Sequence, residues 1–209
     1  MVRPPRTPRY ESRLVPALTV AALVAILVAV PRHYRLLPQF SEVAIGGALI
    51  ASLWTRFARY AIAIFAVLVG GIEITILARL LYEMAKNASN LDAIVLLWTA
   101  IDLWLTNIVL FTLVYWELDR GGRAGRAGTW RGPVDFHFPR GDPSDGVPDD
   151  WKPSFVDYLY LAVTTNTAFS PSEIYPLTNR AKILHMIQSI IGLLTIVAIA
   201  ARAISLLGQ

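Results

Sequence analysis

The sequence predicts an all-α, polytopic integral membrane protein with four to five transmembrane helices and one re-entrant helix and loop. The composition is 55% hydrophobic and only 16% charged, and the mean hydropathy is +0.50, which is typical of membrane proteins. Several apolar runs are long enough to cross a bilayer core of about 30 Å. One shorter apolar run, 155–165, is followed by a polar, proline-containing loop and then by another long apolar segment.

The first part of the chain is predicted to form the periphery of the protein. Residues 1–13 are a basic, arginine-rich arm, which we expect to be disordered and to contact anionic lipid headgroups. Apolar helices are predicted at 14–30, 39–55 and 58–84, and the second, which contains a glutamate and two adjacent glycines, is the weakest candidate for a span. Together, residues 14–85 are expected to be peripheral transmembrane helices.

The second part of the chain is organised differently. An apolar helix is predicted at 91–117, and an exposed loop rich in Gly, Pro, Arg and Asp is predicted at 118–152. A short helix at 155–165 and a polar loop at 166–178 come next. The last helix is predicted at 181–207, which is long enough to span a bilayer.

The stretch 155–178 is expected to enter the membrane and turn back. Ser154 and Asp157 form a capping box at the start of a helix that is too short to cross the bilayer by itself. Non-helical backbone at membrane depth is tolerated only where it is buried in protein or lines a water-filled cavity. A short helix, a loop and a full span in succession therefore predict a re-entrant hairpin.

The same stretch carries a pattern of Thr residues between an acid and a proline. This stretch resembles the pore loop of the tetrameric potassium-channel superfamily. The pattern Thr-Thr-x-Thr-Thr-Val-Gly-Tyr-Gly-Asp-Ile-x-Pro of that family aligns with residues 164–176 without a gap, and two further matches precede it. The matching residues are Asp157, Tyr160, Thr164, Thr165, Thr167, Ile174 and Pro176. The resemblance covers 155–205 and implies a re-entrant pore helix, a filter-like loop and an inner helix, with 91–117 as the outer helix by position.

The selectivity filter of that family is not kept. Its residues Thr-Val-Gly-Tyr-Gly fall on Ala168, Phe169, Ser170, Pro171 and Ser172. The two glycines of that filter adopt backbone conformations that are costly for a residue with a side chain, and serines replace both of them here. The proline fixes its own φ angle and has no backbone N–H to donate. A column of inward-facing carbonyls that replaces the hydration shell of K⁺ is therefore not expected. The aromatic ring of this loop is expected to pack behind it rather than to gate a pore.

Polar residues surround the junction between the short helix and its loop. The short helix ends with Thr164, Thr165 and Asn166, and the loop begins with Thr167. The resemblance implies that they face a permeant species, because a helix C-terminus carries a partial negative charge that favours cations; the alternative is that they only cap the helix and tie the loop. Glu173 would form a ring of carboxylates at the mouth or, alternatively, a structural contact.

Two acids, Glu73 and Asp102, lie near the middle of the third and fourth predicted helices. Intramembrane acids are costly and suggest a function by default. An antiparallel pair of helices would bring them together, where they would share a proton or handle an ion. The alternatives are a salt bridge with Arg79 or Arg202 and a hydrogen bond with Asn107.

The last predicted helix carries His185, Ser189 and Gly192 on one face. This face would line a cavity, where the histidine would confer pH sensitivity; the alternative is a packed, hydrogen-bonded histidine. The glycine would act as a hinge or would allow a neighbouring helix to pack closely.

Several classes of protein are excluded. The chain has no Cys, so disulfides and thiolate metal sites are absent. No sequence motif of an enzyme or of a nucleotide cofactor site is present, and the three His show no metal-ligand spacing. We therefore expect no enzyme, no cofactor and no bound metal. The net charge of +4 comes largely from the N-terminal arm, and without an aromatic-rich basic surface a nucleic-acid partner is not expected.

Two arguments about membrane orientation conflict. The positive-inside rule places the basic arm, the turn at 55–59 and the loop 118–152 in the cytoplasm, whereas the family resemblance implies a loop that faces outward. Both hold only if one of the first three segments does not cross; otherwise the pore enters from the cytoplasm. The aspartates of the loop offset its arginines, which favours the outward-facing loop.

These features predict a multi-pass, channel-like protein of the cell membrane. We expect a homotetramer in which the pore-like module 91–207 conducts an inorganic ion through a non-potassium-type or weakly selective filter. One alternative is a non-conducting structural or regulatory membrane protein that keeps the pore-helix fold. Another is a proton-coupled carrier that uses Glu73 and Asp102.

Overall fold

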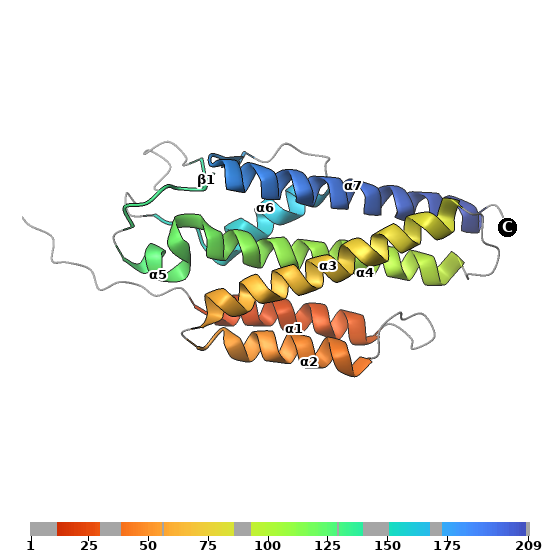
Figure 1. Ribbon diagram of the computed structural model, residues 1–209, viewed down its shortest axis with the longest axis horizontal. Helices are drawn as coiled ribbons and strands as arrows, with labels where there is room; N and C mark the ends of the chain where they lie inside the picture. Colours follow the sequence, from red (N-terminus) through yellow and green to blue (C-terminus); the bar gives the residue numbers. More distant parts are fainter. Residues whose placement is uncertain are drawn as a thin grey trace, which may run out of the picture.

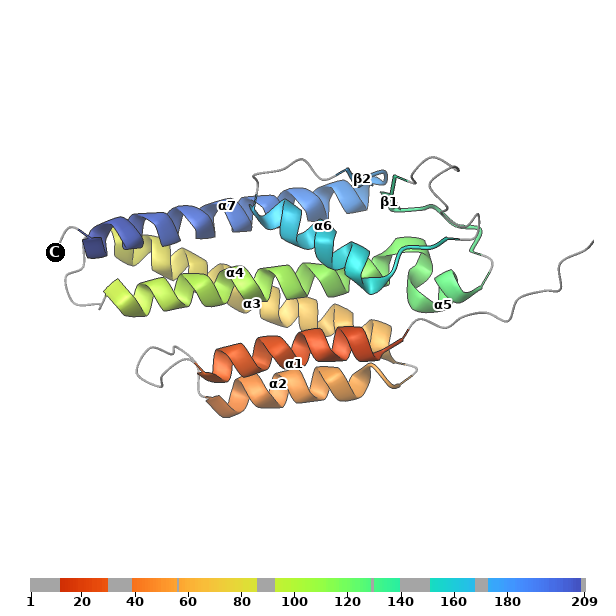
Figure 2. The same ribbon diagram turned by 180° about the vertical axis from the view of Figure 1, so that it is seen from behind.

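The computed structural model describes residues 12–29, 39–55, 57–85, 93–128, 130–139, 151–167 and 173–207. In these ranges the chain forms an elongated bundle of helices (Figures 1 and 2). The elements in chain order are α1 (Leu14–Ala29), α2 (Gln39–Ser52), α3 (Ala58–Ala85), α4 (Ala93–Leu118), a 3₁₀ turn (Asp119–Gly121), α5 (Gly122–Ala127), β1 (Phe136–His137), α6 (Phe155–Thr167), β2 (Tyr175–Pro176) and α7 (Asn179–Leu207). The predicted helical class is confirmed.

Helix boundaries follow the apolar runs of the sequence closely. The short helix α6 begins at Phe155 as predicted and continues two residues beyond its predicted end, to Thr167. The last helix α7 begins at Asn179, two residues earlier than predicted. Thr178 explains this earlier start, because its hydroxyl accepts a hydrogen bond from the N–H of Ala181 and so caps the first turn.

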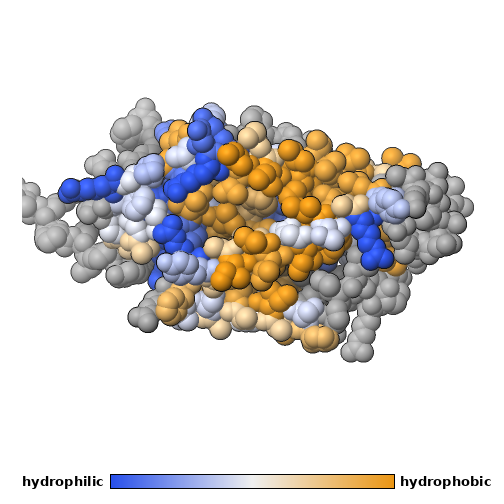
Figure 3. Space-filling model, in the orientation of Figure 1, coloured by the Kyte–Doolittle hydropathy of each residue, from blue (hydrophilic) through white to orange (hydrophobic). Residues whose placement is uncertain are grey.

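Within the described ranges, three helices have the length and apolar composition to cross a membrane. They lie at Ala58–Tyr82, Ile94–Ala127 and Asn179–Ala201. The helices α1 and α2 are apolar but have only 16 and 14 residues, below the usual length of about 17–25 residues for a span. Figure 3 shows hydrophobic residues over the middle of one face and hydrophilic residues toward its two ends, a distribution compatible with a membrane protein.

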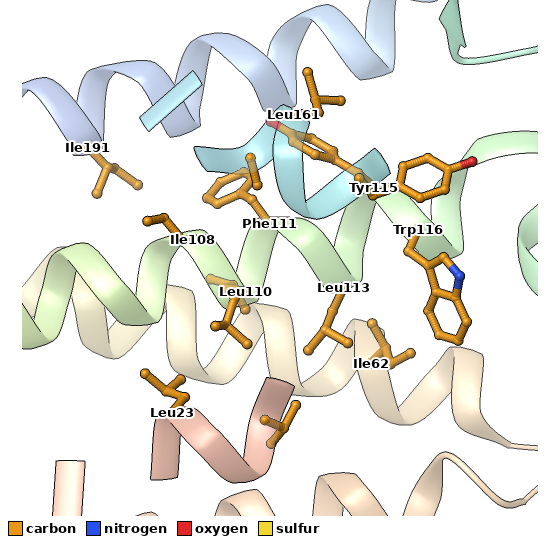
Figure 4. Packing of buried hydrophobic residues seen from close by; sticks show 14 of the residues in the cluster. Leu23, Ile62, Ile108, Leu110, Phe111, Leu113, Tyr115, Trp116, Leu161 and Ile191 are labelled. Atoms are coloured by element: carbon orange, nitrogen blue, oxygen red, sulfur yellow. The ribbon is translucent and has the colours of Figure 1, made fainter. Parts of the chain in front are cut away.

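The helix α4 is the centre of the bundle. It packs against α1 and α3 on one side and against α6 and α7 on the other. Figure 4 shows Leu110 and Leu113 pointing from α4 toward α3, while Ile108 and Phe111 point toward α6 and α7. All four side chains are buried, so both faces of α4 are apolar. A helix that is hydrophobic all round is expected at such a buried position.

The long helices alternate in direction along the bundle. The end that holds α5, β1 and β2, which we call the loop end, also holds the beginning of α1 and the turn between α2 and α3 (Figures 1 and 2). The helix α2 runs antiparallel beside α1. If α1, α2, α3 and α4 all cross, the beginning of α1 and the end of α4 therefore lie on the same side of the membrane. A cytoplasmic arm is then incompatible with an outward-facing loop.

The expectation of an exposed loop at 118–152 is wrong for much of its described part. Residues 119–127 form a 3₁₀ turn and the short helix α5, and residues 136–137 form β1. Five side chains of this segment are buried: Asp119, Arg126, Asp135, Phe136 and Phe138. The polar composition suggested exposure to solvent, but the buried acids and the buried arginine have hydrogen-bond partners on neighbouring elements.

Candidate functional site

The short helix α6 lies between the two long helices α4 and α7 and ends at their midpoints. Its 13 residues correspond to a length of about 20 Å. At its C-terminal end, the Asn166 side-chain amide donates a hydrogen bond of 3.1 Å to the carbonyl oxygen of Trp104, close to the middle of α4. The same side chain lies against Gly192, at the middle of α7. The helix therefore reaches about half of the length of the bundle.

The beginning of α6 is fixed at the loop end. Ser154 donates from its N–H and its hydroxyl to the Asp157 carboxylate, at 2.7 and 2.8 Å, so the predicted capping interaction is present. The ring of Phe155 meets the ring of Trp116 edge-on, with centroids 5.6 Å apart. The first turn of α6 is thus held both by its cap and by the end of α4.

The chain returns to the loop end after α6. The side chain of Ile174 is buried. The strand β2 then pairs with β1 in an antiparallel register, with Phe136 opposite Pro176. The N–H of Leu177 donates to the carbonyl oxygen of Asp135 at 2.8 Å. The stretch 155–178 therefore starts and finishes at the same end of the bundle, which is the geometry expected of a re-entrant hairpin.

Two fully buried carboxylates organise the loop end. The Asp119 carboxylate accepts hydrogen bonds from the N–H groups of Asp135 and Phe136, at 2.8 and 3.3 Å, and from the Tyr158 hydroxyl at 2.7 Å. The Asp135 carboxylate accepts from the Thr178 hydroxyl at 2.5 Å and from the Arg180 guanidinium at 2.6 and 2.7 Å. These bonds join the end of α4, β1, α6 and the beginning of α7.

A buried arginine closes the C-terminal end of α4. The Arg126 guanidinium donates to the carbonyl oxygens of Trp116 and Asp119 at 2.6 and 3.0 Å. It also lies 5.2 Å from the ring centroid of Tyr158 and 5.6 Å from that of Trp116. A cation at a helix C-terminus satisfies its free carbonyls and complements the helix dipole. The side chain therefore holds α4 and α6 together at the loop end.

A buried hydrogen-bond chain crosses α4, α7 and α6 in turn. The Tyr115 hydroxyl donates to the Gln188 side-chain oxygen at 2.7 Å, and the Gln188 amide donates to the carbonyl oxygen of Ala162 at 2.9 Å. The tyrosine and glutamine are fully buried. Losing one partner of a buried pair leaves the other unsatisfied, which is costly, so this chain fixes the relative position of the three helices.

The hydroxyls at the end of α6 are used within their own helix. Thr164 donates to the carbonyl oxygens of Tyr160 and Leu161, Thr165 also donates to Leu161, and Thr167 donates to Thr164. Of the three threonines, Thr165 is buried, while the other two are partly exposed. These contacts agree with the capping alternative, and they leave the partly exposed hydroxyls free to accept hydrogen bonds.

The loop that follows α6 is only partly described. Ala168, Phe169, Ser170, Pro171 and Ser172 lie outside the described residues. Glu173, the last predicted residue of the filter-like loop, is exposed at the loop end.

The predicted residues of the last helix do not share one environment. His185 is half-buried, and Ser189 donates a hydrogen bond of 2.9 Å to the His185 carbonyl oxygen. Gly192 is buried against Asn166, so a side chain at this position would collide with that residue. The close-packing alternative for the glycine therefore has direct support.

The two predicted acids face a cavity that α6 does not line, and they are close enough to interact electrostatically. Glu73 of α3 is 3% exposed and Asp102 of α4 is half-buried. Both line a cavity between α1, α2, α3 and α4. The Asp102 carboxylate accepts a hydrogen bond of 3.2 Å from Thr106. Arg79, considered as a partner, is exposed, and the side chain of Arg202 lies outside the described residues.

Sequence reasoning missed the residues that hold the hairpin. The sequence alone assigns no role in the site to Asp119, Arg126, Asp135 and Arg180, yet their contacts position α6 and the beginning of α7. The sequence does hold one signal that could have identified Asp119, because this acid directly follows a long apolar helix. Among the described residues, no group of three or more His, Asp or Glu could hold a metal ion.

Comparisons with known protein families, with curated proteins and with solved structures found no match. The function is therefore argued from the residues and the geometry of this chain.

The contact between α6 and α7 predicts a specific packing defect. Gly192→Ala should lower the free energy of unfolding by about 1–3 kcal/mol, because the added methyl group meets the side chain and the backbone of Asn166. The matched control is Gly71→Ala in α3, where no atom lies within 4 Å of the added group; it should be neutral or slightly stabilising. Unfolding in detergent micelles measures both.

A double-variant cycle checks the cause of this defect. Gly192→Ala combined with Asn166→Ala should be less destabilised than the sum of the two single variants, because the collision is partly removed. The packing assignment is wrong if Gly192→Ala is as stable as Gly71→Ala.

Proposed function

We propose that this chain is a channel-like, multi-pass protein of the cell membrane that assembles as a homotetramer and conducts ions through a non-potassium-type or weakly selective filter. The observation that supports this most directly is the geometry of α6. A helix of 13 residues is held between α4 and α7, ends at their midpoints and is followed by a return to the loop end.

A helix that ends halfway through a bilayer needs a polar neighbour. Its last carbonyl groups have no backbone N–H partners within the helix, and lipid offers none. These carbonyls also carry the negative end of the helix dipole. A water-filled path that receives cations at the end of α6 satisfies both requirements, whereas lipid around the same groups satisfies neither.

An assembly is supported by the exposed apolar side of α7. A row of apolar residues exposed in the single chain recurs along α7 at alternating spacings of four and three residues: Ile183, Ile187, Ile190, Leu194, Val197, Ala201 and Ile204. This is the spacing of a helix–helix seam. Val156 and Tyr160 extend an exposed face onto α6. Copies gathered by closed rotational symmetry would bury these faces.

The filter is where the chain departs from potassium channels. Serines and a proline replace the glycines and tyrosine of that filter in the sequence, so the proposal is a path of different or lower selectivity. Glu173 is exposed at the loop end, and four copies would place a ring of carboxylates at the mouth. Such a ring attracts cations.

A non-conducting membrane protein that keeps the pore-helix fold is the second candidate. Its support is that the hydroxyls of Thr164, Thr165 and Thr167 donate to carbonyls within α6, as in a purely structural helix end. Ion flux separates the two candidates.

The proposed assembly predicts a cross-link along α7. Because the chain has no Cys, Ile190→Cys introduces one thiol per subunit. Oxidation in the membrane should give covalent dimers, since Ile190 lies on the face where copies meet. The matched control is Val67→Cys on α3, which is 75% exposed at a similar distance from the loop end and should remain monomeric. Equal cross-linking at the two positions would remove the assigned interface.

The proposed mouth predicts a charge-dependent selectivity. Glu173→Gln should lower the cation-over-anion permeability ratio, measured from reversal potentials across planar bilayers under a salt gradient, and Glu173→Asp should retain most of it. The difference in permeability ratio between the wild type and Glu173→Gln should shrink at high salt, because salt screens exposed charges. If no variant and no wild-type protein gives single-channel steps, the non-conducting candidate holds and conduction is rejected.

A further inference from the structure

A cavity lies on the side of the bundle away from α6 and α7. Its volume is about 110 Å³, and it is lined by residues of α1, α2, α3 and α4. Most of its lining is apolar, for example Val20, Phe65 and Val69. The polar side chains at its wall are Glu73, Asp102 and Thr106, which come from α3 and α4. One side of the cavity is therefore acidic and the rest is hydrophobic.

The Glu73 carboxylate is the unusual feature of this cavity. The residue is 3% exposed, and neither of its oxygen atoms has a hydrogen-bond donor in bonding geometry. The buried Asn107 amide lies close enough to interact with it, but the two do not form a hydrogen bond of normal geometry. The described residues that line the cavity include no Lys or Arg. A buried carboxylate in this state is costly unless a proton or a cation neutralises it.

The second acid adds negative charge at the cavity wall, and the apolar volume beside the two acids favours a lipophilic cation over a proton alone. Asp102 interacts electrostatically with Glu73, and its carboxylate is oriented by the hydrogen bond from Thr106. Two carboxylates that face one space make a negative site that one positive ligand charge between them relieves. A proton supplies the same single charge, but it would not use the apolar volume beside the acids.

The lining also indicates the kind of cation. Ca²⁺ and Mg²⁺ need six or more oxygen ligands from protein or water, and apart from two carboxylates and one hydroxyl this cavity presents apolar side chains, which suit neither ligands nor a hydration shell. The volume is of the order of an engineered apolar cavity that admits benzene, which is about 150 Å³. We propose that this cavity binds a small lipophilic ammonium ion, whose charged nitrogen lies between Glu73 and Asp102 and whose apolar body lies against α1, α2 and α3.

This site is independent of the proposed ion path. None of the described residues that line the cavity belongs to α6 or α7, so binding there requires neither conduction nor a tetramer.

Calorimetric titration of the purified full chain in detergent tests the proposal, with benzylamine as the charged probe and benzyl alcohol as its neutral counterpart. Benzylamine should bind saturably and at least about tenfold more tightly than benzyl alcohol, which corresponds to about 1.4 kcal/mol. Glu73→Gln should remove this preference. Glu173→Gln, which removes the same charge at the loop end, should retain it.

A cavity-filling variant separates the site from binding to the detergent or to the protein surface. Val69→Phe places a ring in the cavity and should abolish saturable binding of benzylamine while both acids remain. Equal affinity for the two probes, unchanged benzylamine affinity in Glu73→Gln or in Val69→Phe, or no saturable binding to the wild-type chain would each overturn the proposal. The wild-type comparison and Val69→Phe remain decisive if Glu73→Gln does not fold.

Discussion

The contact between Asn166 and Gly192 sets how deeply the short helix reaches into the bundle. A side chain at Gly192 would meet both the amide and the backbone of Asn166, so the glycine allows the end of α6 to rest directly on α7. The amide of Asn166 then reaches Trp104 on the other side. The end of α6 is thereby held at the midpoints of two long helices, and the proposed ion path depends on that depth.

Three buried acids in this chain show how environment decides their role. Asp119 and Asp135 accept hydrogen bonds from backbone, tyrosine, threonine and arginine donors, so their charge is compensated and they position α6 and α7. Glu73 has no such donors and faces a cavity. Compensated carboxylates are structural, whereas an uncompensated one beside open volume points to a ligand.

Much of the helical architecture could be predicted because apolar runs and caps are local signals. The start of α6 at Phe155 follows from the capping pair before it and from the apolar residues after it. The partners of Asp135 could not be predicted, since Thr178 and Arg180 are more than 40 positions away in the chain. The charge of Arg126 suggested solvent, but the end of α4 and two aromatic rings enclose it. Such contacts depend on tertiary packing, which periodicity does not encode.

The depth of the end of α6 in a lipid bilayer tests the account most directly. Nitroxide labels at Val156→Cys and Thr167→Cys, in this cysteine-free chain, would be relaxed by Gd³⁺ held at the lipid headgroups, which reports distance from the membrane surface whether or not water reaches the label. The account predicts that the label at Thr167 lies about 15 Å deeper than the label at Val156. Equal relaxation of the two labels would show that α6 lies flat at the surface and would contradict the re-entrant helix.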